Sequence, residues 1–297
     1  MATLREIRGR IGGIKSTQKI TKAMKMVAAA KLRRAQDAIV SARPYARKIR
    51  ELMQHLSRAA DSGGQGNPLL VPRTVERLVI VVVTSDRGLC GAFNANIIKA
   101  AINHIKTDYA VMHEAGNVKL VCIGKKGYDF FIKRDYEIIG KHLGLFATLD
   151  FGKARAITEE LVHGYRSREF DRVDVIYNEF KSVMQQRIAV EQFIPIPAEE
   201  TAGEHPHGAA DYIYEPSAKH IVDALVPKHL NFQMWRVLLE SNAAEQGARM
   251  TAMENATSNA GDLIRTLTLS YNKARQAAIT KELLEIVSGA EALKQAT

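Results

Sequence analysis

The first 56 residues follow a single hydrophobic repeat. Apolar or small residues, interrupted by three polar ones, recur at alternating steps of three and four, which is the heptad repeat of a helix that pairs with another helix. The positions are Leu4, Ile7, Ile11, Ile14, Gln18, Thr21, Lys25, Ala28, Leu32, Ala35, Ile39, Ala42, Ala46, Ile49, Met53 and Leu56. At about 1.5 Å per residue, the repeat predicts a helix roughly 80 Å long. We therefore expect residues 1–60 to form one half of a helical pair.

A region of different periodicity follows. Gly, Asn and Pro cluster between Ala59 and Pro68, which ends the helix and predicts a flexible boundary. Short β-branched runs then alternate with helical patterns, which is typical of a three-layer α/β domain with a mostly parallel sheet. We expect strands at 78–83, 118–123, 136–139, 173–180 and 187–194, and helices at 92–106, 125–133 and 151–168. Residues 61–215 are thus predicted to form a Rossmann-like globular insert, ending in a loop at 195–216 with a candidate edge strand at 212–214.

The last segment repeats the pattern of the first. Its seam is Leu239, Ala243, Gln246, Met250, Met253, Thr257, Ala260, Ile264, Leu267, Tyr271, Ala274 and Ala278, and it continues one residue out of phase as Ile279, Leu283, Ile286, Ala290 and Leu293. Residues 216–297 are predicted to form the C-terminal helix, with a candidate break around Pro227. Because the insert joins the end of the first helix to the start of the last, the two must run antiparallel. The predicted fold class is α/β plus a long, antiparallel, left-handed α-helical coiled coil.

Positive charge is concentrated on the first helix. The formal net charge is +10, and residues 1–60 alone hold 15 Lys and Arg against 3 Asp and Glu. This asymmetry indicates an acidic protein surface or a nucleic acid as partner, and the plainest alternative is a solvated helix face. No apolar run approaches the roughly 18–20 residues that cross a bilayer, and we expect no secretory signal. Cys90 and Cys122 fall in or beside strand patterns, which favours buried thiols over a redox pair.

Two segments contain residue types that can carry chemistry. The loop from Thr84 to Gly91 joins a predicted strand to a predicted helix, where α/β folds bind phosphates or place nucleophiles. It lacks the glycine spacing of nucleotide-binding loops, Asp86 would repel a phosphate, and no histidine is placed to activate Cys90. A structural turn is therefore favoured. In the Pro- and Gly-rich loop a solvated segment is favoured over a metal site for Glu204, His205, His207 and Asp211.

Three long motifs, in the same order and over the whole chain, resemble the gamma subunits of F-type ATP synthases. They are the runs KITKAMKMVAAAK at 19–31, SDRGLCG at 85–91 and YNKARQAAITKE at 271–282. The resemblance implies the same architecture, an antiparallel coiled coil with an α/β insert. It also implies a rotor shaft that couples proton flow through the membrane sector to ATP synthesis and hydrolysis at the beta subunits.

The resemblance further implies partners and site residues. One copy of the chain would turn inside a ring of three alpha and three beta subunits, with the insert on the membrane c-ring beside the epsilon subunit, at the cytoplasmic side of a bacterial plasma membrane. It would have no catalytic site, transmembrane segment or nucleic-acid partner, and no bound cofactor, since partner subunits hold ATP, ADP and Mg. The rotor–stator coupling contacts would be Lys22, Met24, Met26, Arg249, Arg275, Gln276, Thr280 and Glu282. The upper bearing would be Leu283, Ile286, Val287 and Leu293.

Two other classes of protein compete with this interpretation. The basic first helix also suits a coiled-coil protein that binds nucleic acid, whose affinity would fall steeply with salt. An α/β enzyme with helical arms is the second alternative, and its activity would survive in residues 70–215 and be lost on changing Cys90.

Overall fold

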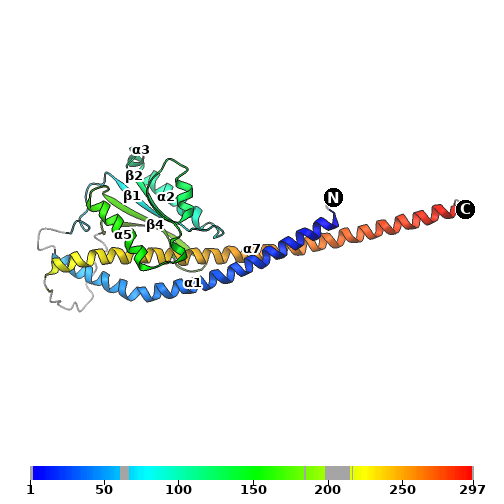
Figure 1. The fold of residues 1–297 in the computed structure, drawn as a ribbon, viewed down its shortest axis with the longest axis horizontal. Helices are drawn as coiled ribbons and strands as arrows, with labels where there is room; N and C mark the ends of the chain where they lie inside the picture. The colour runs from blue at the N-terminus through cyan, green and yellow to red at the C-terminus, as the bar shows by residue number, and fades with distance from the viewer. Residues whose placement is uncertain (1–2, 61–66, 184, 198–214, 216, 296–297) are drawn as a thin grey trace. The chain divides into compact units, whose positions relative to one another are not determined.

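The computed structural model describes residues 3–60, 67–183, 185–197, 215 and 217–295 (Figure 1). Backbone contacts divide the chain into two compact units. One unit is Met1–Val27 with Met250–Thr297, and the other is Ala28–Arg249. Each long helix contributes residues to both units, whereas each predicted domain boundary lies at the end of a helix. The units therefore do not test the predicted domain bounds, which stay a prediction.

The two long helices are α1 (Leu4–Ala60) and α7 (Ala218–Gln295), as the repeats predict. The candidate break around Pro227 is wrong, because α7 continues through this residue. Proline removes a helical hydrogen bond and crowds the carbonyl four residues earlier. On either side of it, Val226 and Leu230 are completely buried in the core, and this packing offsets the local cost.

The predicted seams lie on covered helix faces. Every seam residue of α1 whose side chain is described is buried or half-buried, and so is every seam residue of α7 up to position 278. Within the unit 28–249, Leu32 and Ala35 pack with Ala243, and the Tyr45 ring lies 5.1 Å from the Phe232 ring. As the residue number increases along α1, the residue number of its partner on α7 decreases, which confirms the antiparallel pairing. The hand of the coil stays a prediction.

The out-of-phase continuation of the α7 seam is wrong as a seam within this chain. Every residue from 279 to 290 is exposed, and Ile279, Leu283 and Ile286 are 49%, 56% and 68% exposed. The physical reason is the length of α1. Thr21 lies opposite Thr257 in the antiparallel pair, so α1, which begins 17 residues before Thr21, starts opposite roughly residue 274. The last turns of α7 therefore have no opposing helix in the described chain.

The insert contains a five-stranded sheet in the order β3-β2-β1-β4-β5. Its strands are β1 (Leu78–Val83), β2 (Val118–Ile123), β3 (Glu137–His142), β4 (Arg172–Phe180) and β5 (Gln186–Ile194). The first four are parallel, and β5 returns antiparallel to β4. All five predicted strands are confirmed, and so is the mostly parallel sheet. β3 runs three residues further than predicted.

The helices of the insert are α2 (Phe93–Asp108), α3 (Ala110–Glu114), α4 (Lys125–Phe131) and α5 (Phe151–Arg166), with a short 3₁₀ turn at Leu145–Ala147. The predicted helices at 92–106, 125–133 and 151–168 are confirmed. The sequence does not predict α3 or the 3₁₀ turn, because five and three residues are too few to show a helical period.

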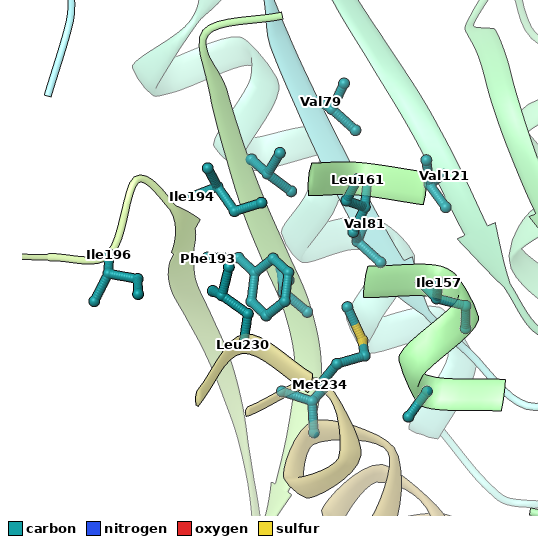
Figure 2. Packing of buried hydrophobic residues seen from close by; sticks show 14 of the residues in the cluster. Val79, Val81, Val121, Ile157, Leu161, Phe193, Ile194, Ile196, Leu230 and Met234 are labelled. Carbon is teal, nitrogen blue, oxygen red and sulfur yellow. The ribbon is translucent and has the colours of Figure 1, made fainter. Parts of the chain in front are cut away.

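Helices cover both faces of the sheet (Figure 1). Alternate residues of β1 point to opposite faces: Val79, Val81 and Val83 belong to a core with α5 and α7, whereas Leu78, Ile80 and Val82 pack with α2 and α4. Figure 2 shows the first of these cores, where Leu230 and Met234 of α7 lie close to Phe193 of β5. Burial on both faces explains the continuous apolar run of β1.

Three predicted features lie outside the described residues. They are residues 61–66 of the flexible boundary, the candidate edge strand at 212–214, and the loop with metal-ligand residue types, Glu204, His205, His207 and Asp211.

Candidate interaction surface

Polar side chains join α1 to α7 in the unit formed by residues 1–27 and 250–297. Thr21 Oγ1 lies 2.7 Å from Thr257 Oγ1, and Gln18 Nε2 donates to the Thr257 carbonyl at 3.3 Å. Lys25 Nζ lies 2.5 Å from a carboxylate oxygen of Glu254, in a half-exposed ion pair of the kind that contributes at most about 1 kcal/mol. These directional contacts fix the register of the two helices at the polar positions of the seam.

A groove of about 630 Å³ opens beside these contacts. It is lined by Gln18, Lys19, Lys22, Lys25, Met26, Glu254, Thr257, Ser258 and Gly261. Three lysines face one glutamate, so the groove is positively charged, and Met26, which is 61% exposed, adds an apolar patch. Two predicted coupling residues, Lys22 and Met26, thus lie in the groove, while Met24 is half-buried on α1 outside it.

A basic stripe runs along α1 in the same unit. Its members follow one another at steps of three, four or seven residues, and all are exposed: Arg5, Arg8, Lys15, Lys19 and Lys22. Such spacing places side chains on one face of a helix. Glu6 is the one acidic residue between positions 3 and 27. The net charge of residues 1–60 does not show which basic residues share a helix face. Their spacing along the sequence could have revealed the stripe.

The predicted coupling residues of the last helix are exposed on α7. They are Arg275, Gln276, Thr280 and Glu282. The Thr280 hydroxyl donates to the Gln276 carbonyl at 2.9 Å, a bond within the helix that leaves the Gln276 side chain free to face solvent. Their role as contacts with another chain stays a prediction.

The predicted bearing residues form an exposed apolar surface near the end of α7. Leu283, Ile286 and Val287 are 56%, 68% and 59% exposed, and Leu284, which the resemblance does not place in the bearing, is 61% exposed beside them. The side chain of Leu293 lies outside the described residues. Single exposed apolar residues are common on soluble proteins, but four of them within five positions form an apolar patch, which makes this end of α7 a candidate interaction surface.

Arg249 differs from the other predicted contacts because it belongs to the unit 28–249 and its side chain is only 11% exposed. Its guanidinium lies 2.5 Å from Glu245 and donates to the carbonyls of Arg87 at 3.3 Å and Gly88 at 3.2 Å. Burial raises the pKa of Glu245, and the positive charge of Arg249 opposes this shift. Arg249 therefore ties α7 to the loop between β1 and α2, whatever its contacts with other chains.

The β1–α2 loop is built as a turn held by hydrogen bonds. The Asp86 carboxylate accepts from the backbone amides of Lys125 at 3.1 Å and Gly144 at 2.9 Å. Cys90 is buried, and burial raises the pKa of its thiol, against a smaller opposing effect of Ser85. A protonated, buried thiol is a poor nucleophile. This supports the structural turn predicted for the loop.

The helix α7 also covers the place where open α/β sheets bind ligands. That place is the carboxyl end of neighbouring strands where the strand order reverses, here β1 and β4. Ala244 of α7 is completely buried in the same core as Val82 and Ile176. A side chain at Gly247 would lie 3.5 Å from the Phe180 ring at the end of β4. The chain thus fills its own switch point with a helix.

A charged cluster joins α2 to β4. The His104 ring nitrogens lie 2.7 Å from Asp108 Oδ2 and 3.1 Å from Asp174 Oδ2. Asp174 is 1% exposed and also accepts from the Tyr109 hydroxyl at 3.2 Å and from Arg172 Nε at 2.8 Å. Because carboxylates face both ring nitrogens, His104 donates to both only when it is protonated. The hydrogen bond to Asp174 raises the pKa of His104, and burial opposes it.

We expect this cluster to make the stability of the chain depend on pH. Folded His104 holds its proton more tightly than the unfolded chain does, so its contribution is complete below the unfolded pKa of about 6.5 and is lost as the pH rises through the higher folded pKa. Urea unfolding of the purified chain from about pH 5.5 to 8.5 measures this loss. His104→Gln should flatten the decline, and an equal decline in both proteins would contradict the assignment.

The described residues show neither of two further kinds of site. No group of three His, Cys, Asp or Glu side chains within them is placed to hold a metal ion. None of the helices that the structure describes is both long and apolar enough to cross a bilayer. What the described surface does offer is the basic stripe, the groove and the apolar end of α7.

These features define a class of protein in which two long antiparallel helices carry an α/β domain inserted between them. A family model described as ATP synthase matches residues 3–293. The ATP synthase gamma chain of Prosthecochloris aestuarii is 57% identical over 99% of both chains, and that of Chlorobaculum tepidum is 55% identical over 99% of this chain and 100% of its own. The chain belongs to the ATP synthase gamma chain family.

Solved structures share the fold at lower identity. A chain of the Euglena gracilis mitochondrial ATP synthase is 21% identical, with a TM-score of 0.69 over 98% of this chain and 94% of that chain. A chain from the central stalk and c-ring of the Tetrahymena thermophila mitochondrial ATP synthase is 24% identical, with a TM-score of 0.58 over 80% of this chain and 99% of that chain. These similarities confirm the predicted fold class.

Proposed function

We propose that the chain is the central rotor shaft of an F-type ATP synthase, and that its rotation couples proton flow through the membrane sector to ATP synthesis or hydrolysis at the beta subunits. Membership of the gamma chain family supports this function. The observation that carries the proposal is the exposed surface of the helix pair. A basic stripe on α1 and an apolar end on α7 are left uncovered by the described chain, as a shaft inside a ring of other subunits requires.

The proposed partners are three alpha and three beta subunits, one epsilon subunit and the membrane c-ring, with one copy of this chain in the assembly. The similar Tetrahymena chain comes from a structure of a central stalk with a c-ring, and the Euglena chain from an assembly of OSCP, F1 and c-ring. The α/β unit would rest on the c-ring. We place the assembly at the cytoplasmic side of a bacterial plasma membrane, with this chain as a peripheral subunit, because the curated relatives are bacterial.

The coupling contacts follow from charge and exposure. We propose that acidic loops of the ring bind the groove and the basic stripe, where Lys22 and Met26 lie together, and that opposite charge speeds and orients this contact. The apolar end of α7 at Leu283, Ile286 and Val287 would turn inside an apolar bearing of the ring. The same proposal assigns coupling roles to Met24, Arg249, Arg275, Gln276, Thr280 and Glu282, and a bearing role to Leu293.

In this proposal the chain has no catalytic site and binds no cofactor, and the partner subunits hold ATP, ADP and Mg. Two features of the α/β unit support this. The switch point that other folds of this class use for ligands is filled by α7 around Ala244 and Gly247. The one cysteine in the β1–α2 loop, Cys90, is buried with a raised pKa.

Affinity purification of the tagged chain from gently solubilised membranes tests the function. The rotor assignment predicts an assembly with two larger nucleotide-binding subunits, each in three copies per tagged chain. Purified chain that binds DNA tightly at physiological salt, and that brings down no nucleotide-hydrolysing subunit, would favour the nucleic-acid alternative instead. Catalytic activity retained by residues 70–215 and lost on changing Cys90 would favour the enzyme alternative.

A further inference from the structure

A polar network fastens α7 to two strands of the sheet within the unit 28–249. Arg236 Nη2 of α7 lies 2.5 Å from Glu191 Oε2 of β5, and Arg236 Nη1 donates to the Tyr177 hydroxyl of β4 at 3.2 Å. The Tyr177 hydroxyl donates in turn to Glu191 Oε1 at 2.7 Å. Three side chains from three elements thus form a closed triangle of hydrogen bonds.

The network is partly shielded from water. Tyr177 is completely buried, and the side chains of Arg236 and Glu191 are 27% and 29% exposed. A second carboxylate, that of Glu240 one turn further along α7, lies 3.7 Å from Arg236 Nη1. Burial raises the pKa of Glu240, and Arg236 opposes this shift. Charge-assisted bonds in such surroundings are strong and depend on direction.

On the core side of this network, the contact between α7 and the sheet is apolar. Val226, Leu230 and Met234 of α7 are completely buried in the core that contains Phe193 of β5 (Figure 2). Apolar burial holds surfaces together but depends little on direction, because it scales with the area removed from water. Arg236, which follows Met234 by two positions, adds bonds that are broken when the helix turns about its own axis against the sheet.

We propose that the network of Arg236, Glu191 and Tyr177 fixes the rotational position of α7 on the sheet, and so carries torque from the α/β unit into the shaft. The inference rests on the rotor function proposed above. In such a rotor the c-ring drives the α/β unit, and α7 must follow it without slipping. Apolar packing keeps α7 on the sheet, and the network keeps it from turning there.

The double variant Arg236→Met/Glu191→Leu tests the inference in membrane vesicles that carry the complete complex. Removing both charges leaves Glu240 as the remaining carboxyl of the cluster, and because burial raises its pKa, it can take up a proton once Arg236 is gone, so we expect the fold and its melting temperature to be retained. The rate of ATP hydrolysis should stay at the wild-type value, because the beta subunits can still hydrolyse ATP when α7 turns against the sheet. Protons pumped per ATP hydrolysed should fall by about threefold or more.

Two further variants sharpen the comparison. Arg236→Lys keeps a cation near Glu191 and should recover part of the pumping ratio, which a purely structural role would not predict. Arg187→Met is the matched control, because Arg187 pairs with Glu179 between the strands β4 and β5, 2.8 Å apart, and its side chain is 66% exposed. It should pump like the wild type.

Each outcome has one meaning. A double variant that keeps its melting temperature and pumps with the wild-type ratio overturns the inference. If the double variant melts early, Tyr177→Phe replaces it, since this change removes two bonds of the triangle and no charge; a wild-type ratio in that variant overturns the inference equally. A wild-type complex that hydrolyses ATP without any pumping would refute the proposed function itself, before any variant is compared.

Discussion

Gly124→Ala is expected to prevent stable folding of the unit 28–249. Gly124 follows β2 with φ +91°, and an added Cβ would lie 2.0 Å from the carbonyl oxygen of Thr84. Thr84 cannot move away, because it is completely buried and its amide and hydroxyl both donate to the Ile123 carbonyl, at 2.8 Å and 3.2 Å. Backbone strain alone costs about 1–3 kcal/mol, and the clash adds to it. We expect a total loss above about 4 kcal/mol in urea unfolding.

Gly116→Ala is the matched control for this prediction. Gly116 also has a left-handed backbone, with φ +74°, but no atom lies within 4 Å of the position that its Cβ would take. Only the strain remains, so the variant should lose about 1–2 kcal/mol. Equal losses in the two variants would show that backbone strain, and not the contact with Thr84, decides the outcome at Gly124.

Met24→Lys should uncouple ATP hydrolysis from proton pumping while leaving the fold intact. Met24 is half-buried on α1, so a lysine there can extend its amine into solvent without unfolding the helix. It would stand between Lys22 and Lys25, which line the positively charged groove. If acidic loops of the ring bind this region, each rotational step must break an additional ion pair. We expect the pumping ratio in vesicles to fall by about threefold or more, at an unchanged melting temperature.

Met24→Leu controls for the loss of the methionine side chain. Leucine is close to methionine in volume and carries no charge, so it should pump with the wild-type ratio. The assignment of Met24 to the coupling region would be refuted if Met24→Lys were fully coupled. It would also be refuted if both variants lost the same fraction of pumping, because charge would then have no part in the effect.

The repeats of the chain made the helix pair and the sheet predictable. The heptad seam of α1 and the seam of α7 up to Ala278 are visible because each residue's place depends only on its spacing to its neighbours. The strand β1 was equally clear, since six apolar residues in succession leave few alternatives to a strand buried on both faces. Beyond residue 278 the apolar spacing still predicts a seam, but α1 does not extend far enough to cover it.

The contacts that matter most to the proposals could not be predicted from the spacing of residues along the sequence. The triangle of Arg236, Glu191 and Tyr177 joins residues 14 to 59 positions apart, on elements whose order in the sheet the sequence does not state. Arg249 was predicted as a contact with other chains, but its bonds to the β1–α2 loop depend on how α7 crosses the end of the sheet. Tertiary packing likewise decided that α7 continues through Pro227.

Direct observation of rotation tests the central claim. Both native cysteines are buried, so Val111→Cys on α3, at a position that is 80% exposed, offers one reactive thiol for a gold particle. With the ring fixed to a surface and MgATP supplied, a rotor shaft predicts that the particle turns continuously in one direction, and that it stops when ATP is removed. A particle that stays still while the fixed ring hydrolyses ATP would contradict the account.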